Sequence, residues 1–306
     1  MNFTEKILNS HPLSCKDNGL FGVLEEELCT YGCKITKDAL GSLFFTKKIG
    51  QGQSFMLCTG CDVPGVVATY VENSKVYVGE LGKADVQKLA HTKVVFDGIS
   101  GLLSVPDSYS NSTSLNDCYV ETFDEKASEK ISLGDKGYFD MPLYSLSESI
   151  YSGYGIGVKA CVLALANMGK KLFDKECEKR LLDKGIGSVT LAFLGQTSLV
   201  SRGAFVAARG INPDKILLLT AAEASKLSPC ADKDVKYAVK MLDKAFVSDG
   251  TFVGEICSYF DEQNIKYHKA VNADTDPALK ALSRAESTPA CAEICLPVFG
   301  AGAVVI

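Results

Sequence analysis

The spacing of hydrophobic residues changes twice along the chain and divides it into three stretches. In the first stretch, apolar residues three and four positions apart predict a helix at 19–30, and short apolar runs predict strands at 42–46 and 54–58. Between about 66 and 142, β-branched and aromatic residues form short runs separated by Gly, Asp, Asn and Ser, which predicts a small all-β unit. After Gly157 the helical spacing returns.

The third stretch alternates strand and helix. The pattern predicts helices at 158–172, 174–184, 201–209, 232–246, 251–263 and 277–284, and strands at 188–194, 215–219, 265–271 and 294–298. Such alternation predicts a mostly parallel sheet with both faces covered. Because this texture resumes after the β-rich stretch, we expect one α/β domain, residues 1–65 and 143–306, interrupted by an inserted domain at 66–142.

The composition limits which classes of binding partner and which cellular compartment are expected. The 306 residues carry a formal charge of -5, and no run of five Lys or Arg occurs, which argues against nucleic acid or an anionic membrane as the main partner. No apolar stretch approaches the roughly 20 residues of a membrane helix. The first residues carry Glu5 where a secretory signal would be basic, so a cytoplasmic protein is expected.

Twelve cysteines in a chain of this length are expected to be reduced thiols. Cys58 and Cys61 have the Cys-x-x-Cys spacing of redox and zinc sites. They end a predicted strand, where residues three apart point to opposite faces, so one metal could bind both only if Thr59 and Gly60 formed a turn. Buried free thiols are the favoured interpretation, with a thiolate zinc site or redox regulation as alternatives.

The sequence contains only three histidines for catalysis or metal binding. His11, His91 and His268 stand far apart, and none belongs to a His-x-Asp or His-Glu-x-x-His pattern. A histidine metal site or a Ser-His-Asp triad is therefore poorly supplied, and isolated surface or hydrogen-bonded histidines are expected.

A glycine-rich segment, Gly153-Tyr-Gly-Ile-Gly157, opens a predicted helix. The start of a helix presents free amides that favour phosphate, so a nucleotide loop is one interpretation. A dinucleotide motif would place its third glycine one position later and directly after a hydrophobic strand. Glycines at a tight junction between the two domains are the favoured alternative.

Short motifs follow one another through nearly the whole chain. They are Asp38-Ala-Leu-Gly-Ser-Leu43, Phe55-Met-Leu-Cys-Thr-Gly-Cys-Asp-Val-Pro-Gly65, Gly157-Val-Lys-Ala-Cys-Val162, Gln196-Thr-Ser-Leu-Val-Ser-Arg-Gly-Ala-Phe-Val-Ala-Ala208, Asn212-Pro-Asp214, Thr275-Asp276 and Cys295-Leu-Pro297. With a β-rich insertion after the second, this order resembles the co-catalytic metallo-aminopeptidases that assemble into tetrahedral particles, a family of glutamyl and leucyl aminopeptidases often labelled endoglucanase.

The resemblance implies a fold and a cofactor. The fold would be a zinc-exopeptidase-like three-layer α/β/α sandwich with a mixed, mostly parallel sheet, plus an inserted small β-barrel that helps subunits to associate. The family would use two zinc, cobalt or manganese ions. Whether this chain can do so depends on the residues at the ligand positions.

Those positions hold mostly small, uncharged residues. The family's His-x-Asp falls on Gly60-Cys61-Asp62, so the aspartate that orients a ligand is kept and the ligand is lost. Its Glu-Glu pair, general base followed by metal ligand, falls on Thr197-Ser198. The remaining ligands fall on Ile156 or Gly157 (the bridging Asp), Thr220 (the Asp that ends the next strand) and Gly302 (the last His).

A dinuclear hydrolase needs carboxylate and imidazole ligands and a carboxylate base, so these replacements imply that no catalytic residue and no metal is retained. We expect a catalytically inactive homologue that acts as a binding, scaffolding or regulatory protein. Its partners would be a peptide or small polar ligand, and copies of itself or an active paralogue. The alternatives are an active hydrolase using Ser198, Ser201 or the cysteines, and a phosphate- or nucleotide-binding protein using the glycine segment.

Overall fold

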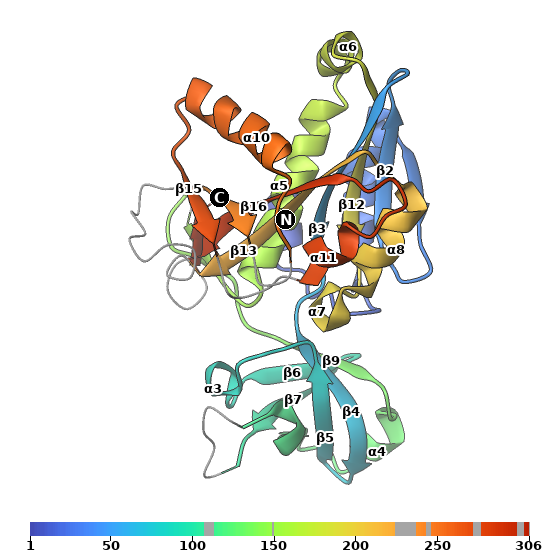
Figure 1. Ribbon diagram of the computed structural model, residues 1–306. Coiled ribbons are helices and arrows are strands. Elements are labelled where there is room, and N and C mark those ends of the chain that lie inside the picture. Colours follow the sequence, from blue (N-terminus) through green and yellow to red (C-terminus); the bar gives the residue numbers. More distant parts are fainter. Residues whose placement is uncertain are drawn as a thin grey trace.

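A mixed sheet and a closed barrel form the two parts of the protein (Figure 1). The structure is a computed structural model that describes residues 1–106, 113–148, 150–223, 237–242, 246–271, 277–298 and 303–305. The main sheet has eight strands in the order β1 (Lys34–Lys37), β2 (Leu43–Lys48), β12 (Ile186–Leu194), β3 (Gln53–Gly60), β13 (Lys215–Glu223), β16 (Ala290–Val298), β14 (Tyr237–Leu242) and β15 (Tyr267–Val271). Strands β12, β3, β13 and β16 run parallel, and β2 and β14 join them antiparallel. The sheet is mixed and mostly parallel, as the sequence predicts.

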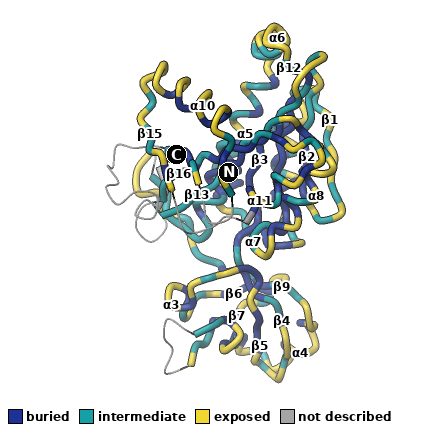
Figure 2. The backbone as a smooth tube through the Cα atoms, in the orientation of Figure 1, coloured by how far each residue is buried: buried dark blue, intermediate teal, exposed yellow. Residues whose placement is uncertain are grey.

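Helices cover both faces of this sheet. On one face, α2 and α5 bury Leu24 and Leu165 against Leu57 and Phe193 of the strands. On the other, α8 packs closely through Ala204 and its neighbours, together with α11. Helix α10 lies on the same face as α2 and α5 and covers the end of the sheet formed by β14 and β16, where Leu217 and Ile294 contact both clusters. Figure 2 shows the resulting buried layer of strands between exposed helix surfaces. The helices are α1 (Phe3–Leu8), α2 (Leu20–Leu28), α5 (Ile156–Leu172), α6 (Lys175–Asp183), α7 (Thr197–Val200), α8 (Arg202–Ile211), α10 (Gly250–Glu262), α11 (Pro277–Leu282) and the 3-10 turn η1 (Cys29–Tyr31).

The barrel is inserted between β3 and α5. Its six strands close in the order β4 (Gly65–Glu72), β5 (Lys75–Leu81), β8 (Tyr119–Glu121), β7 (Ile99–Ser104), β6 (Lys93–Phe96) and β9 (Lys136–Phe139). Alternate residues point inward, so Val76, Val78, Phe96 and Phe139 fill the interior and the barrel holds a core rather than a channel. The short helices α3 (Val86–Leu89) and α4 (Ala127–Lys130) and the 3-10 turn η2 (Leu115–Asp117) lie in its loops.

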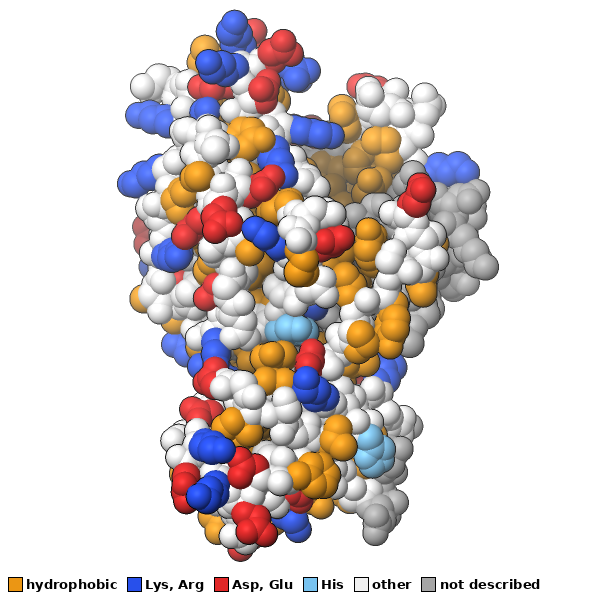
Figure 3. Space-filling model, turned by 180° about the vertical axis from the view of Figure 1, so that it is seen from behind, with side chains coloured by type: hydrophobic (Ala, Val, Ile, Leu, Met, Phe, Trp, Pro, Cys, Tyr) orange, Lys and Arg blue, Asp and Glu red, His pale blue; other side chains and the backbone are white. Residues whose placement is uncertain are grey.

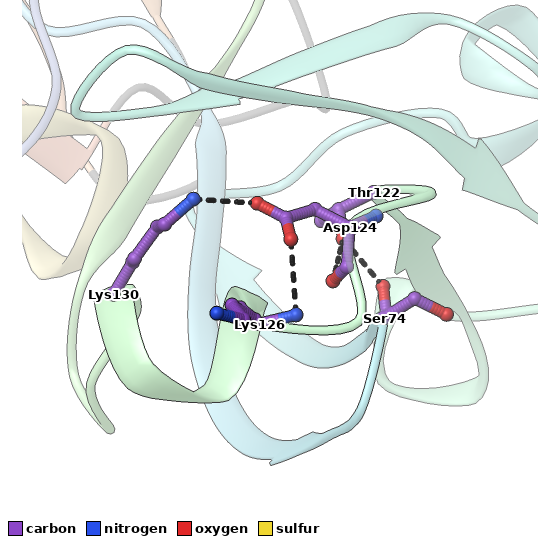
Figure 4. Close-up of polar contacts among 5 residues, drawn as sticks. All are labelled: Ser74, Thr122, Asp124, Lys126 and Lys130. Atoms are coloured by element: carbon purple, nitrogen blue, oxygen red, sulfur yellow. Dashed lines mark hydrogen bonds and ion pairs between the residues drawn. The ribbon is translucent and has the colours of Figure 1, made fainter.

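The loop between β8 and α4 is held by a small polar network (Figure 4). Asp124 accepts from the Lys126 amide at 2.9 Å and from Lys130 Nζ at 2.7 Å, and Thr122 Oγ1 donates to the Ser74 carbonyl at 2.8 Å. These contacts tie the start of α4 to the β4–β5 turn. The network lies beside α4, at the end of the barrel that is far from the α/β domain (Figure 1).

Residues near the domain junction form a separate small sheet of β10 (Tyr144–Ser145), β11 (Ile150–Ser152) and β17 (Ala303–Val305). The sequence pattern did not predict these strands, nor β1. Each is short, and β1 and β10 are largely exposed, so they lack the apolar alternation that a sequence pattern detects.

One predicted element is wrong. The helix expected over 232–246 is strand β14 at Tyr237–Leu242, while 232–236 and 243–245 lie outside the described residues. The apolar spacing fits a helix, but this segment is hydrogen-bonded to β15 and β16 on both sides. Lys240 is buried there and pairs with Glu293 of β16. Pairing with distant strands therefore overrides the local pattern. The other predicted helices and strands are present.

Within the described part of the chain, every helix is too short or too polar to cross a membrane. On the face shown in Figure 3, acidic and basic side chains are interspersed, and hydrophobic side chains gather at the narrow junction between the barrel and the α/β domain.

Candidate functional site

Most of the residues singled out by the resemblance lie at the carboxyl ends of the parallel strands, on the side of the sheet that faces the barrel (Figure 1). This is the end at which open α/β sheets place their ligand sites. A hollow of about 260 Å³ lies there. Five of the predicted residues, Gly60, Asp62, Thr197, Ser198 and Thr220, line it together with mostly apolar neighbours. The full lining is Thr59, Gly60, Asp62, Pro64, Lys83, Val158, Cys161, Thr197, Ser198, Leu218, Leu219, Thr220, Ala221 and Ala278.

Asp62 is the centre of the polar network in this hollow. Its side chain is 5% exposed. Oδ1 accepts from the Thr197 amide at 2.9 Å and from Thr197 Oγ1 at 2.5 Å. Oδ2 accepts from the Ser198 amide at 3.0 Å, from Ser198 Oγ at 2.5 Å, and from Ser14 Oγ. The carboxylate thus accepts five hydrogen bonds, all from neutral donors.

The turn before α7 explains this geometry. Gln196 adopts a left-handed conformation with φ 52°, which reverses the chain after β12 and aims the first amides of α7 at Asp62. The Gln196 side chain is buried and donates from Nε2 to the Leu40 carbonyl at 3.0 Å. Gly203 completes the turn, because a Cβ there would lie 1.9 Å from the Gly195 carbonyl oxygen.

Gly60 and Thr197 are sterically matched. A Cβ on Gly60 would lie 2.5 Å from Thr197 Oγ1. Any side chain at position 60, including a ligand histidine, would therefore require Thr197 to move. The two replacements support one another: the hydroxyl that binds Asp62 occupies the space that a larger residue at 60 would need.

The start of α5 is packed rather than open. A Cβ on Gly157 would lie 2.8 Å from Ala221 Cβ and 3.0 Å from Val298 Cγ2. Ile156 is buried with Leu8 and Ala160 in a cluster that does not line the hollow. The structure therefore keeps Gly157 close to the site through Ala221 but places Ile156 elsewhere. Gly302, the remaining predicted position, lies outside the described residues.

A second buried carboxylate lies beside the hollow, and the sequence reasoning missed it. Thr220 Oγ1 donates to Glu293 Oε1 at 2.5 Å, and Lys240 Nζ lies 2.7 Å from the same oxygen. Glu293 is 0% exposed and Lys240 5%. The available signal was a single charged residue within each of two otherwise apolar strand sequences, which marks a buried ion pair. Ser14 was also missed; nothing in its loop sequence points to Asp62.

The hollow does not fit the two metal ions that the resemblance implies. Among the described residues, no group of three or more His, Cys, Asp or Glu side chains could hold a metal ion. Asp62 is the one carboxylate that lines the hollow, and hydroxyl and amide donors point at both of its oxygens. A cation at these oxygens would have to displace those donors, and the neighbouring Thr and Ser hydroxyls are poor substitutes for carboxylate and imidazole.

The cysteine pair is split by the sheet. Cys58 packs in the cluster under α8 and α11, whereas Cys61 packs with α2 and α5 on the other face. Each thiol donates to a carbonyl, of Leu217 at 3.7 Å and of Leu194 at 3.2 Å. Burial raises the pKa of Cys61 well above its usual value, helped by the nearby Asp62 carboxylate. The pair has the geometry of buried thiols, not of a shared metal or redox site.

None of the three histidines lines the hollow. His11 stacks on Tyr138 of the barrel at 4.5 Å between ring centroids, and burial, followed by the charge of Lys159, lowers its pKa to about 4. His91 is exposed in a turn. His268 lies on the edge strand β15 with its Nε2 buried and without a hydrogen-bond partner among the described residues.

The glycine segment before α5 packs at the domain junction. Gly155 has φ 64°, and a Cβ on it would lie 2.3 Å from Val63 Cγ1. Tyr154 donates from its hydroxyl to the Pro64 carbonyl at 3.1 Å, and burial raises the pKa of Tyr154. Close packing against the chain that enters the barrel accounts for these glycines without a bound phosphate.

No family model matches the sequence, and no curated protein matches it. Solved structures do match its fold. An aminopeptidase from the archaeon Desulfurococcus kamchatkensis superposes with a TM-score of 0.85 at 17% identity, covering 99% of this chain and 89% of that one. A TET aminopeptidase from the marine sediment archaeon Thaumarchaeota archaeon SCGC AB-539-E09 gives 0.84 at 15% identity, covering 99% and 91%.

The TET1 peptidase of Pyrococcus horikoshii, which can assemble into a tetrahedron or a large octahedral shell, gives a TM-score of 0.79 at 16% identity over 99% of this chain and 93% of that one. These similarities span nearly the whole length of both partners, including the sheet and the inserted barrel. At such identities they establish the architecture and leave the activity to be argued from the site. The chain has the fold of the TET aminopeptidases.

Proposed function

We propose that the protein is a catalytically silent relative of the dinuclear metallo-aminopeptidases that serves as a binding or scaffolding protein. The observation that carries this proposal is the state of Asp62: both of its oxygens are hydrogen-bonded by Thr197 and Ser198, the residues at the family's Glu-Glu position, and by Ser14. The carboxylates that would bind metal and accept a proton in the family are replaced here by Thr197 and Ser198, which donate hydrogen bonds to the remaining carboxylate.

The hydroxyls of this network are poorly placed for nucleophilic catalysis. Ser198 Oγ donates to Asp62 Oδ2 and lies 2.9 Å from Ser14 Oγ, and no imidazole lines the hollow. A serine nucleophile needs a base that can accept its proton and hand it on, and both oxygens of the Asp62 carboxylate already accept hydrogen bonds from fixed amide and hydroxyl donors. Ser201 is buried, and its hydroxyl faces the Thr197 carbonyl at 3.5 Å.

Assembly is the second part of the proposal. The fold is shared over nearly its full length with a peptidase that forms closed particles. We propose that this chain also forms a homo-oligomer or joins an active paralogue, and that the barrel contributes to the contact. Light scattering coupled to size-exclusion chromatography tests this part: a multiple of the 32.8 kDa chain is expected, and a strict monomer that also fails to bind an active paralogue would contradict it.

The catalytic part is tested by turnover. Purified protein is incubated with zinc, cobalt or manganese and assayed on a panel of aminoacyl-p-nitroanilides and short peptides, with an active TET peptidase as positive control. We expect no hydrolysis above that of an Asp62→Ala variant. Turnover that depends on added metal, is abolished by a chelator and is lost in Asp62→Ala would overturn the proposal.

A further inference from the structure

The barrel forms the rim of the hollow at α7. The turn after β5 lies on Ser198: Gly82 has φ 88°, and a Cβ on it would lie 2.9 Å from Ser198 Cβ and 3.3 Å from Pro64 Cα. The next residue, Lys83, lines the hollow from its exposed side. Only Gly fits at 82, so the turn is fixed against α7 and the place of Lys83 at the rim is set by the fold.

Lys83 and Asp62 are the two charged residues among those lining the hollow, and they are in different situations. Asp62 is buried and its oxygens are hydrogen-bonded. Lys83 forms no ion pair with any described residue, whereas the nearby Lys88 lies 3.6 Å from Asp85 and 3.7 Å from Glu223. The rim therefore presents one cation that forms no ion pair with the described part of the chain.

The interior of the hollow offers a different surface. Its walls are largely apolar, formed by Val158, Leu218, Leu219, Ala221 and Ala278. Its hydroxyl groups already donate hydrogen bonds within the protein: Thr197 and Ser198 to Asp62, Thr220 to Glu293, and Thr59 to the Gly60 carbonyl. An anionic group inside would find no free hydroxyl donor there, so the buried end of a ligand is best apolar and its anionic end best placed at the rim.

We propose that this hollow binds a small aliphatic carboxylate, with the carboxylate at Lys83 and a short branched carbon chain against the apolar wall. The volume of about 260 Å³ is below that of typical drug-sized sites and suits such a ligand. The inference rests on the proposed loss of the metal centre, since two cations at the floor would reverse the polarity of the site. The carboxylate could belong to a simple acid or to an amino acid.

The test is a titration of metal-free protein with three matched compounds, followed by calorimetry or ligand-observed NMR. They are isovalerate, isoamylamine and leucine. Isovalerate is expected to bind, and isoamylamine is not. Leucine is expected to bind several-fold more weakly than isovalerate, because its ammonium group would lie beside Lys83. Tighter binding of leucine would identify an amino acid as the source of the carboxylate and keep the proposal. Binding of isoamylamine, or no binding of either acid, would overturn it.

Three variants locate the ligand. Lys83→Met should weaken isovalerate binding about three- to fivefold, the effect of one exposed ion pair. Val158→Phe fills the hollow and should reduce binding more than tenfold. Lys88→Met, on the same edge of the barrel, should leave the affinity unchanged. All three should keep the circular dichroism spectrum of the parent, and an unchanged affinity in both Lys83→Met and Val158→Phe would overturn the assignment.

The outcome of the ligand titration can be distinguished from the outcome of the turnover assay that tests the proposed function. Metal-dependent peptidase turnover would contradict catalytic silence whatever the titration shows. Failure of isovalerate to bind metal-free protein would remove the carboxylate site and leave catalytic silence standing.

Discussion

Two buried carboxylates beside the same hollow are stabilised in opposite ways. Asp62 accepts five hydrogen bonds from neutral hydroxyl and amide groups, whereas Glu293 faces the Lys240 ammonium at 2.7 Å and accepts one hydroxyl from Thr220. Asp62 needs no counterion because its donors are numerous and fixed by the start of α7. Glu293 lies on β16, which pairs with β13 on one side and β14 on the other, and the Lys240 ammonium of β14 lies beside its carboxylate. The comparison shows two ways in which this fold stabilises a buried acid: by neutral donors at the start of a helix, or by a lysine on a neighbouring strand.

The largest effect should come from breaking the ion pair. Lys240→Met removes the ammonium that lies 2.7 Å from Oε1 of the fully buried Glu293, and should lower the free energy of unfolding by about 3–5 kcal/mol. Urea denaturation measures this. The double variant Lys240→Met/Glu293→Leu should recover most of the loss, because well-packed apolar residues often replace a buried ion pair at little cost. A double variant as unstable as the single would show that loss of the pair itself, rather than the carboxylate that the single variant leaves at position 293, determines the cost.

Another buried ionisable side chain is a lysine on the long helix α5. Lys159 on α5 is 4% exposed, no described residue forms an ion pair with it, and burial lowers its pKa from 10.5 to about 8. The unfolded chain therefore binds more protons than the folded one between these values, so stability should rise with pH from about 8 to about 10.5. Lys159→Met should stabilise the protein at pH 7 by about 2–3 kcal/mol. Urea denaturation from pH 7 to 10.5 should show the gain shrinking as pH rises.

The direction of the stability change in Lys159→Met decides whether the buried lysine is a cost to the fold. A lysine stabilised by an undetected partner would show the reverse, with Lys159→Met destabilising at pH 7. Lys170→Met, on the same helix but paired with Glu27 at its surface, is the matched control and should show little pH dependence over this range.

A smaller loss is expected at the first carboxylate. Asp62→Asn replaces an acceptor-only group by an amide whose NH₂ faces hydroxyl and amide donors, and should cost about 2 kcal/mol by urea denaturation. Asp214→Asn is the control, since Asp214 accepts from the amide and hydroxyl of Ser54 in an exposed setting and should lose less than about 1 kcal/mol. Equal losses at the two sites would contradict a special role for the Asp62 network.

The smallest effect should come from removing one donor. Ser14→Ala deletes one of five hydrogen bonds to Asp62 and should lower the free energy of unfolding by about 1 kcal/mol. Ser10→Ala, which deletes a hydroxyl contact to the Ile7 carbonyl in the same loop, serves as a control for the loop. A loss from Ser14→Ala that matches that of Asp62→Asn would mean that the loop, not the number of donors, stabilises the carboxylate.

The sequence predicts the fold better than the site for physical reasons. Strands β3, β12 and β13 are covered on both faces, so their apolar runs are visible in the sequence, and the barrel is visible through its short β-branched runs. Strand β14 is misread because its apolar spacing also fits a helix, and the neighbours that decide its conformation come from β15 and β16.

The site could be located from the sequence only through the resemblance. The resemblance assigns Gly60, Asp62, Thr197-Ser198 and Thr220 to one site, and the structure places them in one hollow. It gives no partner for Asp62, because Ser14 lies on a loop 48 residues away and only the folded chain brings the two together. Lys83 comes from the inserted barrel, and its place at the rim depends on how the two domains pack.

The proposed function requires that the site hold no catalytic metal, and the metal content of the purified protein tests this. Untagged protein, purified without chelator and incubated with zinc, cobalt or manganese before desalting, is analysed by plasma mass spectrometry beside an active TET peptidase. We expect less than a tenth of an equivalent of metal bound per chain. One or two equivalents held stoichiometrically, and lost in Asp62→Ala, would show that the donors around Asp62 give way to a metal and would contradict the proposed function.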